Sequence, residues 1–102
     1  MKLELRSETR DDGIMTLWLN CPERSVVVLD EWLLDQLHFF FDWLDKQARP
    51  KGFILASASE RVFVAGADLA EIESKNDEQL HAYLTEGAHA FARIATLPCP
   101  TV

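Results

Sequence analysis

Apolar and polar positions alternate at the start of the chain. Residues 3–8 (LELRSE) alternate as the residues of a half-buried strand do. Residues 14–20 (IMTLWLN) are also strand-like, because they mix β-branched, aromatic and aliphatic side chains. Asp11, Asp12 and Gly13 lie between the two stretches, and Asp-Gly favours the tight turn of a hairpin. The pattern predicts an N-terminal β-hairpin.

A helical period follows an extended, β-branched run at 26–28. Asp30 is placed to cap a helix that reaches about Ala48, and Arg49-Pro50 ends it. One face of this helix is apolar and carries Leu33, Leu37, Phe40, Phe41 and Leu44. Aromatic residues widen that surface at Trp32, Phe39 and Trp43. We therefore expect the helix to pack on a sheet and to contact a further element.

The second half of the chain again alternates predicted strands with predicted helices. Residues 52–56 (GFILA) predict a strand buried on both faces, residues 62–64 a short extended run, and residues 69–73 a helical turn. Asn76 and Gln79 predict a capping box at the start of a second long helix. The apolar face expected for that helix consists of Leu80, Tyr83, Leu84, Ala88, Phe91, Ile94 and Ala95. After two prolines, Thr101-Val102 begins a further strand, so the fold class is α/β.

Composition narrows the function classes. The chain has 102 residues, a net charge of −7, and 48% hydrophobic residues, which excludes a disordered chain and disfavours a nucleic-acid binder. We expect no targeting peptide, no membrane span and a cytoplasmic location. Cys21 and Cys99 are too few for a disulfide scaffold, and the three histidines lack metal-ligand spacing, so no metal site is expected.

The most informative segment is the small-residue turn Ala65-Gly66-Ala67-Asp68, between an extended run and a helix. Small side chains leave the backbone uncovered, and the free N–H groups at such a turn can donate to an oxyanion or a polarised carbonyl. The same residues also fit a simple strand-to-helix turn in which Asp68 is the cap. Local chemistry leaves both interpretations open.

The segment 64–69 (VAGADL) resembles the first oxyanion-hole motif of the crotonase (enoyl-CoA hydratase/isomerase) superfamily. The likeness runs from about Gly13 to Val102 and is similar to the hydratase portion of multifunctional fatty-acid β-oxidation α-subunits. It includes four further pieces in the family's order, namely 19–24 (LNCPER), 28–30 (VLD), 53–55 (FIL) and 97–102 (LPCPTV). The resemblance implies the N-terminal part of a crotonase-like ββα spiral fold, an incomplete domain over residues 1–102.

The resemblance also implies roles for individual residues. The backbone N–H of Ala67 would be one of two donors to the thioester oxygen of an acyl-CoA. The substrate would lie across the backbone of Ala65, Gly66, Ala67, Asp68, Leu69 and Ala70. Arg24 lies where relatives often carry a basic residue near the CoA phosphates, although a solvated surface arginine explains it equally well. Coenzyme A would enter as part of the substrate, and no other cofactor is implied.

The family's second donor and its acid and base glutamates come after the strand that starts at Thr101, so we expect the fragment itself to be inactive. The implied function is the acyl-CoA-binding part of an enoyl-CoA hydratase or isomerase of fatty-acid β-oxidation. A non-catalytic acyl-CoA-binding or protein-interaction module is the alternative. We expect self-association or a homo-oligomer. The reaction type and the acyl chain length are not determined by these residues.

Overall fold

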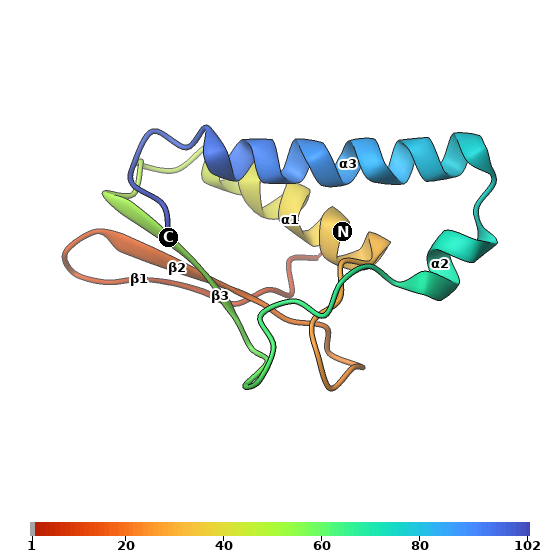
Figure 1. Cartoon of the computed structure of the whole chain (residues 1–102). Coiled ribbons are helices and arrows are strands. Elements are labelled where there is room, and N and C mark those ends of the chain that lie inside the picture. The colour runs from red at the N-terminus through yellow and green to blue at the C-terminus, as the bar shows by residue number, and fades with distance from the viewer. Residues whose placement is uncertain (1) are drawn as a thin grey trace.

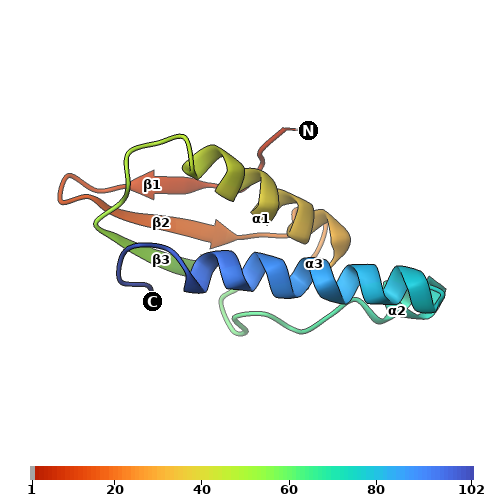
Figure 2. The ribbon, with the colours of Figure 1, turned by 90° about the horizontal axis from the view of Figure 1, so that it is seen from above.

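A computed structural model describes residues 2–102; Met1, the first residue of the expected domain, lies outside the described residues. Three strands form one sheet in the order β1 (Ser7–Thr9), β2 (Ile14–Leu19) and β3 (Gly52–Ser57). Strand β1 pairs antiparallel with β2, and β2 pairs parallel with β3. Three helices, α1 (Glu31–Leu44), α2 (Leu69–Ser74) and α3 (Asp77–Ala95), complete the fold. The long helices α1 and α3 lie on the same side of the sheet (Figures 1 and 2).

The predicted hairpin is present, with Gly13 at φ +89° in its turn. Its first strand is shorter than expected, because residues 2–4 leave the sheet and bond to α1 instead. The buried side chain of Gln36 accepts a hydrogen bond from the N–H of Glu4 at 2.7 Å and donates one to the carbonyl of Lys2 at 2.8 Å. A polar residue on the core face of α1 thus ties down the start of the chain.

The core lies between the sheet and α1. Strand β2 alternates as its sequence predicts, and Met15, Leu17 and Leu19 are buried on one face. They belong to one cluster with Phe53 of β3 and with the expected face of α1, namely Leu33, Leu37, Phe40, Phe41 and Leu44. Helix α1 ends at Leu44 rather than near Ala48. Lys46 and Gln47 donate to carbonyls three residues back, which tightens the chain after the helix.

Two expectations for the extended segments are wrong. Strand β3 is not buried on both faces, since only Gly52 and Phe53 are buried and the side chains from Ile54 onward are partly exposed. Its outer edge is where residues 100–102 begin to pair in parallel, through a bridge between Phe53 and Thr101. Neither 26–28 nor 62–64 forms a strand, although Val27 still bonds to Ala65 and to the Ser59 hydroxyl.

Helix α3 begins with the predicted capping box of Asn76 and Gln79. Its apolar face is narrower than expected. Tyr83 and Ala90 are buried and Leu80 and Ile94 pack against the core, whereas Leu84 is 59% exposed and Phe91 is 42% exposed. The helix therefore carries a buried stripe and a second, exposed stripe of Leu84, Ala88, Phe91 and Ala95. Arg93 fastens its C-terminal end to α1, through Asp42 at 2.9 Å and Asp45 at 3.1 Å.

Candidate acyl-thioester site

The turn at 65–68 is attached to the segment that leads into α1. The N–H of Ala65 donates to the carbonyl of Val27 at 2.7 Å, and the N–H of Leu29 donates to the carbonyl of Gly66 at 2.8 Å. Leu29 and Ala67 form a parallel bridge. Gly66 has φ +115°, a conformation that L side chains rarely adopt. The sequence predicts segments 26–28 and 65–68 as separate elements. In the structure they lie side by side, just before the start of α1 and of α2.

The N–H of Ala67 is not used by the fold. Within the described part of the chain, no hydrogen bond is donated by this N–H, and Ala67 is exposed. Its neighbours on either side are engaged, because Ala65 and Gly66 bond to the 27–29 segment and Asp68 caps α2. An exposed N–H on an anchored backbone is a donor that a ligand can reach without rearranging the turn.

Ala67 also lines an apolar groove of about 210 Å³ between α3 and the turn. Most of the wall comes from buried and exposed apolar side chains of α1 and α3. The lining residues are Leu29, Leu34, Ala67, Tyr83, Leu84, Gly87, Ala88 and Phe91. A polar backbone donor therefore borders a space suited to a hydrocarbon chain, which matches the two chemical ends of an acyl thioester.

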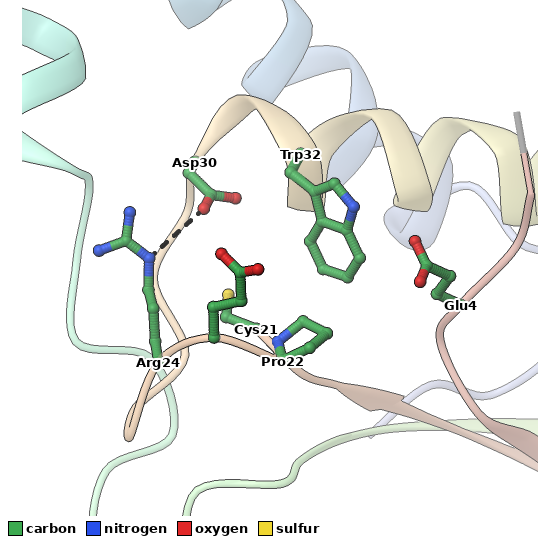
Figure 3. A pocket seen from close by; sticks show the side chains of 7 residues that line it. Glu4, Cys21, Pro22, Arg24, Asp30 and Trp32 are labelled. Atoms are coloured by element: carbon green, nitrogen blue, oxygen red, sulfur yellow. Dashed lines mark ion pairs between the residues drawn. The ribbon is translucent and has the colours of Figure 1, made fainter.

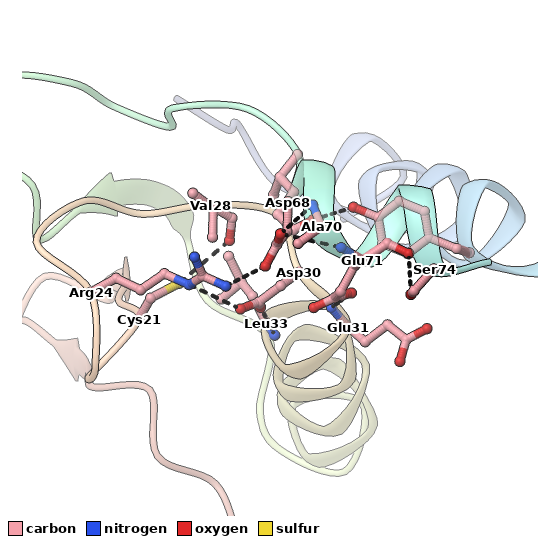
Figure 4. Close-up of polar contacts among 12 residues, drawn as sticks. Cys21, Arg24, Val28, Asp30, Glu31, Leu33, Asp68, Ala70, Glu71 and Ser74 are labelled. Carbon is pink, nitrogen blue, oxygen red and sulfur yellow. Dashed lines mark hydrogen bonds and ion pairs between the residues drawn. The ribbon is translucent and has the colours of Figure 1, made fainter. Parts of the chain in front are cut away.

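Asp68 is the N-cap of α2, as the simpler interpretation of the turn predicts. Its carboxylate accepts from the N–H of Ala70 at 3.0 Å and from the N–H of Glu71 at 3.3 Å (Figure 4). These bonds, the one from Glu71 first, together with the guanidinium of Arg24, hold the pKa of Asp68 below its usual value. The side chain is thereby kept ionised and engaged, which suits a structural carboxylate and not a proton donor.

Arg24 lies between two helix caps. It forms an ion pair with Asp68, and its Nε lies 3.6 Å from a carboxylate oxygen of Asp30, the cap of α1 (Figures 3 and 4). The Arg24 side chain is 41% exposed, so the same group can still face a ligand. It borders a pocket of about 370 Å³ that is lined by Glu4, Cys21, Pro22, Glu23, Asp30 and Trp32. In that pocket, burial raises the pKa of the Cys21 thiol.

Of the remaining residues expected to line the site, Ala65 is exposed on the turn, and Leu69 and Ala70 are exposed at the start of α2. Sequence reasoning missed two residues that support it. The hydroxyl of Tyr83 donates to the carbonyl of Leu29, and Lys75 pairs with Glu31 at the start of α1. Tyr83 was predicted only as an apolar face residue, and its hydroxyl, which must find a partner when buried, was the available signal.

Residues 2–102 contain neither a membrane-spanning helix nor a cluster of metal ligands. The described helices include none long and apolar enough to cross a membrane. The same residues include no group of three or more His, Cys, Asp or Glu side chains placed to hold a metal ion.

The fold of this chain is similar to that of solved enoyl-CoA hydratases. The chain superposes on the enoyl-CoA hydratase of Bacillus anthracis with a TM-score of 0.82 and 27% identity, over 95% of this chain and 37% of that one. It superposes on the enoyl-CoA hydratase of Mycobacterium smegmatis with a TM-score of 0.80 and 25% identity, over 99% of this chain and 38% of that one. The chain is a portion of a crotonase-superfamily fold.

Curated relatives of this crotonase-fold chain agree with the structures. It is 35% identical over 92 residues to an enoyl-CoA isomerase/hydratase of Zymoseptoria tritici, and 30% identical over 94 residues to a fatty acid oxidation complex subunit alpha of Shewanella frigidimarina. The alignments cover 87% and 91% of this chain, which spans 30% and 13% of the two relatives. No family model matches the sequence.

Proposed function

We propose that this chain is the acyl-CoA-binding N-terminal part, residues 1–102, of an enoyl-CoA hydratase or isomerase of fatty-acid β-oxidation. The observation that carries the proposal is the unused N–H of Ala67 at the border of an apolar groove. Relatives named as enoyl-CoA hydratases and as α-subunits of a fatty acid oxidation complex support the substrate class. No cofactor beyond the CoA of the substrate is needed for this chemistry.

The proposed role of Ala67 follows from where charge develops. Hydration or isomerisation of an enoyl thioester passes through an enolate-like species with negative charge on the thioester oxygen. A fixed N–H aimed at that oxygen stabilises the transition state more than the ground state, and one such donor is typically worth about 2.7–4 kcal/mol. The acyl chain would enter the groove beside Gly87 and Phe91, and the backbone of residues 65–70 would face the thioester.

Binding of the nucleotide part is assigned to Arg24. Its partial exposure leaves N–H donors available to a CoA phosphate, although two carboxylates already contact the guanidinium. The two carboxylates beside Ala67 are also engaged, Asp68 by Arg24 and Glu71 by the N–H of Glu31 at 3.1 Å. Neither is placed to act as a general acid or base, so we propose that the 102-residue chain binds acyl-CoA without turning it over.

The test is carbon-13 NMR of an enoyl-CoA labelled at the thioester carbon and mixed with the 102-residue chain. Polarisation by the N–H should move the carbonyl signal downfield. Replacing Ala67 by L-lactate through semisynthesis turns the amide into an ester and removes the N–H with little change of shape. This variant should still bind the ligand and should lose most of the downfield shift. An unchanged shift would mean that Ala67 is not the donor.

A further inference from the structure

Helix α2 has limited apolar attachment to the rest of the chain, because Ile72 is its one residue that packs against the core, and Ile72 is only partly buried. The helix consists of six residues, none of them buried, and its first residue, Leu69, is 72% exposed. Its position against α1 therefore depends mainly on polar contacts. These contacts are the ion pair of Asp68 with Arg24, the hydrogen bond from the N–H of Glu31 to Glu71, and the ion pair of Lys75 with Glu31. Of the three, only the first reaches the turn that contains Ala67.

Arg24 contacts the caps of two helices with one guanidinium. Asp30 accepts from the N–H of Leu33 at 2.8 Å at the start of α1, while Asp68 accepts from two N–H groups at the start of α2. The two carboxylate side chains are only 11% and 13% exposed. Without the cation, two largely buried negative charges would face each other at the junction, and repulsion would separate the helix starts.

We infer that Arg24 is a positioning residue: by holding the two caps together, it fixes the direction of the Ala67 N–H. This inference rests on the proposed function, in which that N–H binds the thioester oxygen. Ala67 immediately precedes Asp68, so the Asp68 cap anchors the chain just after the donor peptide, while the backbone bonds of Ala65 and Gly66 to residues 27–29 anchor it just before. A guanidinium suits this role because its fixed, planar fork contacts two carboxylates at once, whereas an ammonium is a single point charge.

The decisive variant is Arg24→Met in the 102-residue chain, examined first without ligand. Hydrogen exchange of the Ala70 and Glu71 amides, which the Asp68 cap protects, should accelerate roughly tenfold or more, and the Ala67 amide resonance should shift. The amides of β2 and β3 should keep their protection, which shows that the fold is intact. Arg49→Met removes a positive charge from an exposed site and should change none of these signals. Unchanged exchange and an unchanged Ala67 resonance in Arg24→Met would overturn the inference.

The labelled enoyl-CoA then separates positioning from ligand binding. We expect Arg24→Met to lose most of the downfield carbonyl shift even when the chain is saturated with ligand, a loss that weaker binding of the CoA phosphates alone would not cause. If Arg24 served only the CoA phosphates, CoA affinity would fall, the affinity for a dephosphorylated analogue would not, and exchange at α2 would be normal; that pattern would also overturn the inference. If the unmodified chain shows no carbonyl shift, the proposed function fails, and the ligand-free exchange result still decides the role of Arg24 in the turn.

Two further variants control for misfolding of Arg24→Met and for an effect of Arg24 that does not act through Asp68. Arg24→Lys retains the charge, so it should fold even where Arg24→Met does not, and it should show an intermediate gain in exchange at Ala70 and Glu71. In the Asp68→Asn background the ion pair is already weakened, and Arg24→Met should then add much less than it does alone. Full additivity of the two changes would show that Arg24 does not act through Asp68.

Discussion

The hydroxyl of Tyr83 donates a hydrogen bond to the carbonyl of Leu29, the residue that bridges to Ala67. Helix α3 thus holds the segment that is bridged to the candidate donor residue. Lys75 lies over the Tyr83 ring at 5.4 Å and pairs with Glu31, which connects the same contact to the start of α1. The turn is consequently supported by residues from the 21–30 loop and from α3, which lie far from it in the sequence.

Tyr83→Phe should lower the free energy of unfolding by about 1 kcal/mol, the usual net value of one hydrogen bond. The ring stays buried and the carbonyl of Leu29 loses its partner, so urea denaturation should show a reduced midpoint with an unchanged slope. Burial, and after it the carboxylates of Glu71 and Asp30, raise the pKa of the Tyr83 hydroxyl. The neutral form is therefore favoured by folding. The contribution is present below the ordinary pKa of about 10 and is lost as the pH rises through the raised folded value, a dependence that Tyr83→Phe should remove.

Gly66→Ala and Gly87→Ala form a matched pair of opposite sign. Nothing lies within 4 Å of a β-carbon built at Gly66, so its cost is conformational, and φ of +115° predicts a loss of about 1–3 kcal/mol in unfolding free energy. A β-carbon at Gly87 meets only Leu34 Cδ1 at an ordinary 3.9 Å, inside a regular helix. That variant should gain about 0.5–1 kcal/mol. Thermal unfolding of both proteins checks the pair, and a stabilised Gly66→Ala would contradict the backbone argument.

The sequence-based predictions that the structure confirms rest on residues that are close together in the chain. Each helix start has a side chain within four residues that satisfies its free N–H groups, as at Asp30, Asp68 and the Asn76–Gln79 box. The alternation of β2 fixes which of its faces is buried. These features depend on neighbours in the sequence, and so the sequence is enough to predict them.

Features that depend on distant residues were not predictable in the same way. Arg24 and Asp68 are 44 residues apart, and the hydroxyl of Tyr83 reaches a carbonyl 54 residues away. The period of α3 placed Leu84 and Phe91 on its apolar face, but it could not show that the packing of the chain leaves both side chains exposed. Gln36 was missed because a buried amide on a helix becomes favourable only when a chain end comes close enough to bond with it.

The attachment of α2 should be stable to mild acid. The pKa of Asp68 is lowered in the folded chain, so its cap contributes fully above the ordinary pKa of about 4 and is lost as the pH falls through the lower folded value. The Ala70 and Glu71 amide resonances should therefore stay constant from pH 7 to about pH 5 and move only below about pH 4. In Asp68→Asn that acid transition should be absent. A transition near pH 6 in the unmodified chain would contradict this sign.

Self-association was expected from the sequence through the sheet edge at Thr101 or the 32–44 helix, and the structure adds a third candidate surface, the exposed stripe on α3. Leu84, Ala88 and Phe91 form a continuous apolar surface beside the groove, and burying such a surface is worth about 25 cal/mol for each Å². Phe91→Glu places a charge in the middle of the stripe and should shift the sedimentation profile from oligomer to monomer. His89→Glu adds the same charge at an exposed position of the same helix and should leave association unchanged. Because the stripe also borders the groove, Phe91→Glu should weaken binding of a long-chain acyl-CoA more than binding of free CoA. Equal association of the three proteins would locate the contact elsewhere, and equal loss of both ligands would separate the groove from the acyl chain.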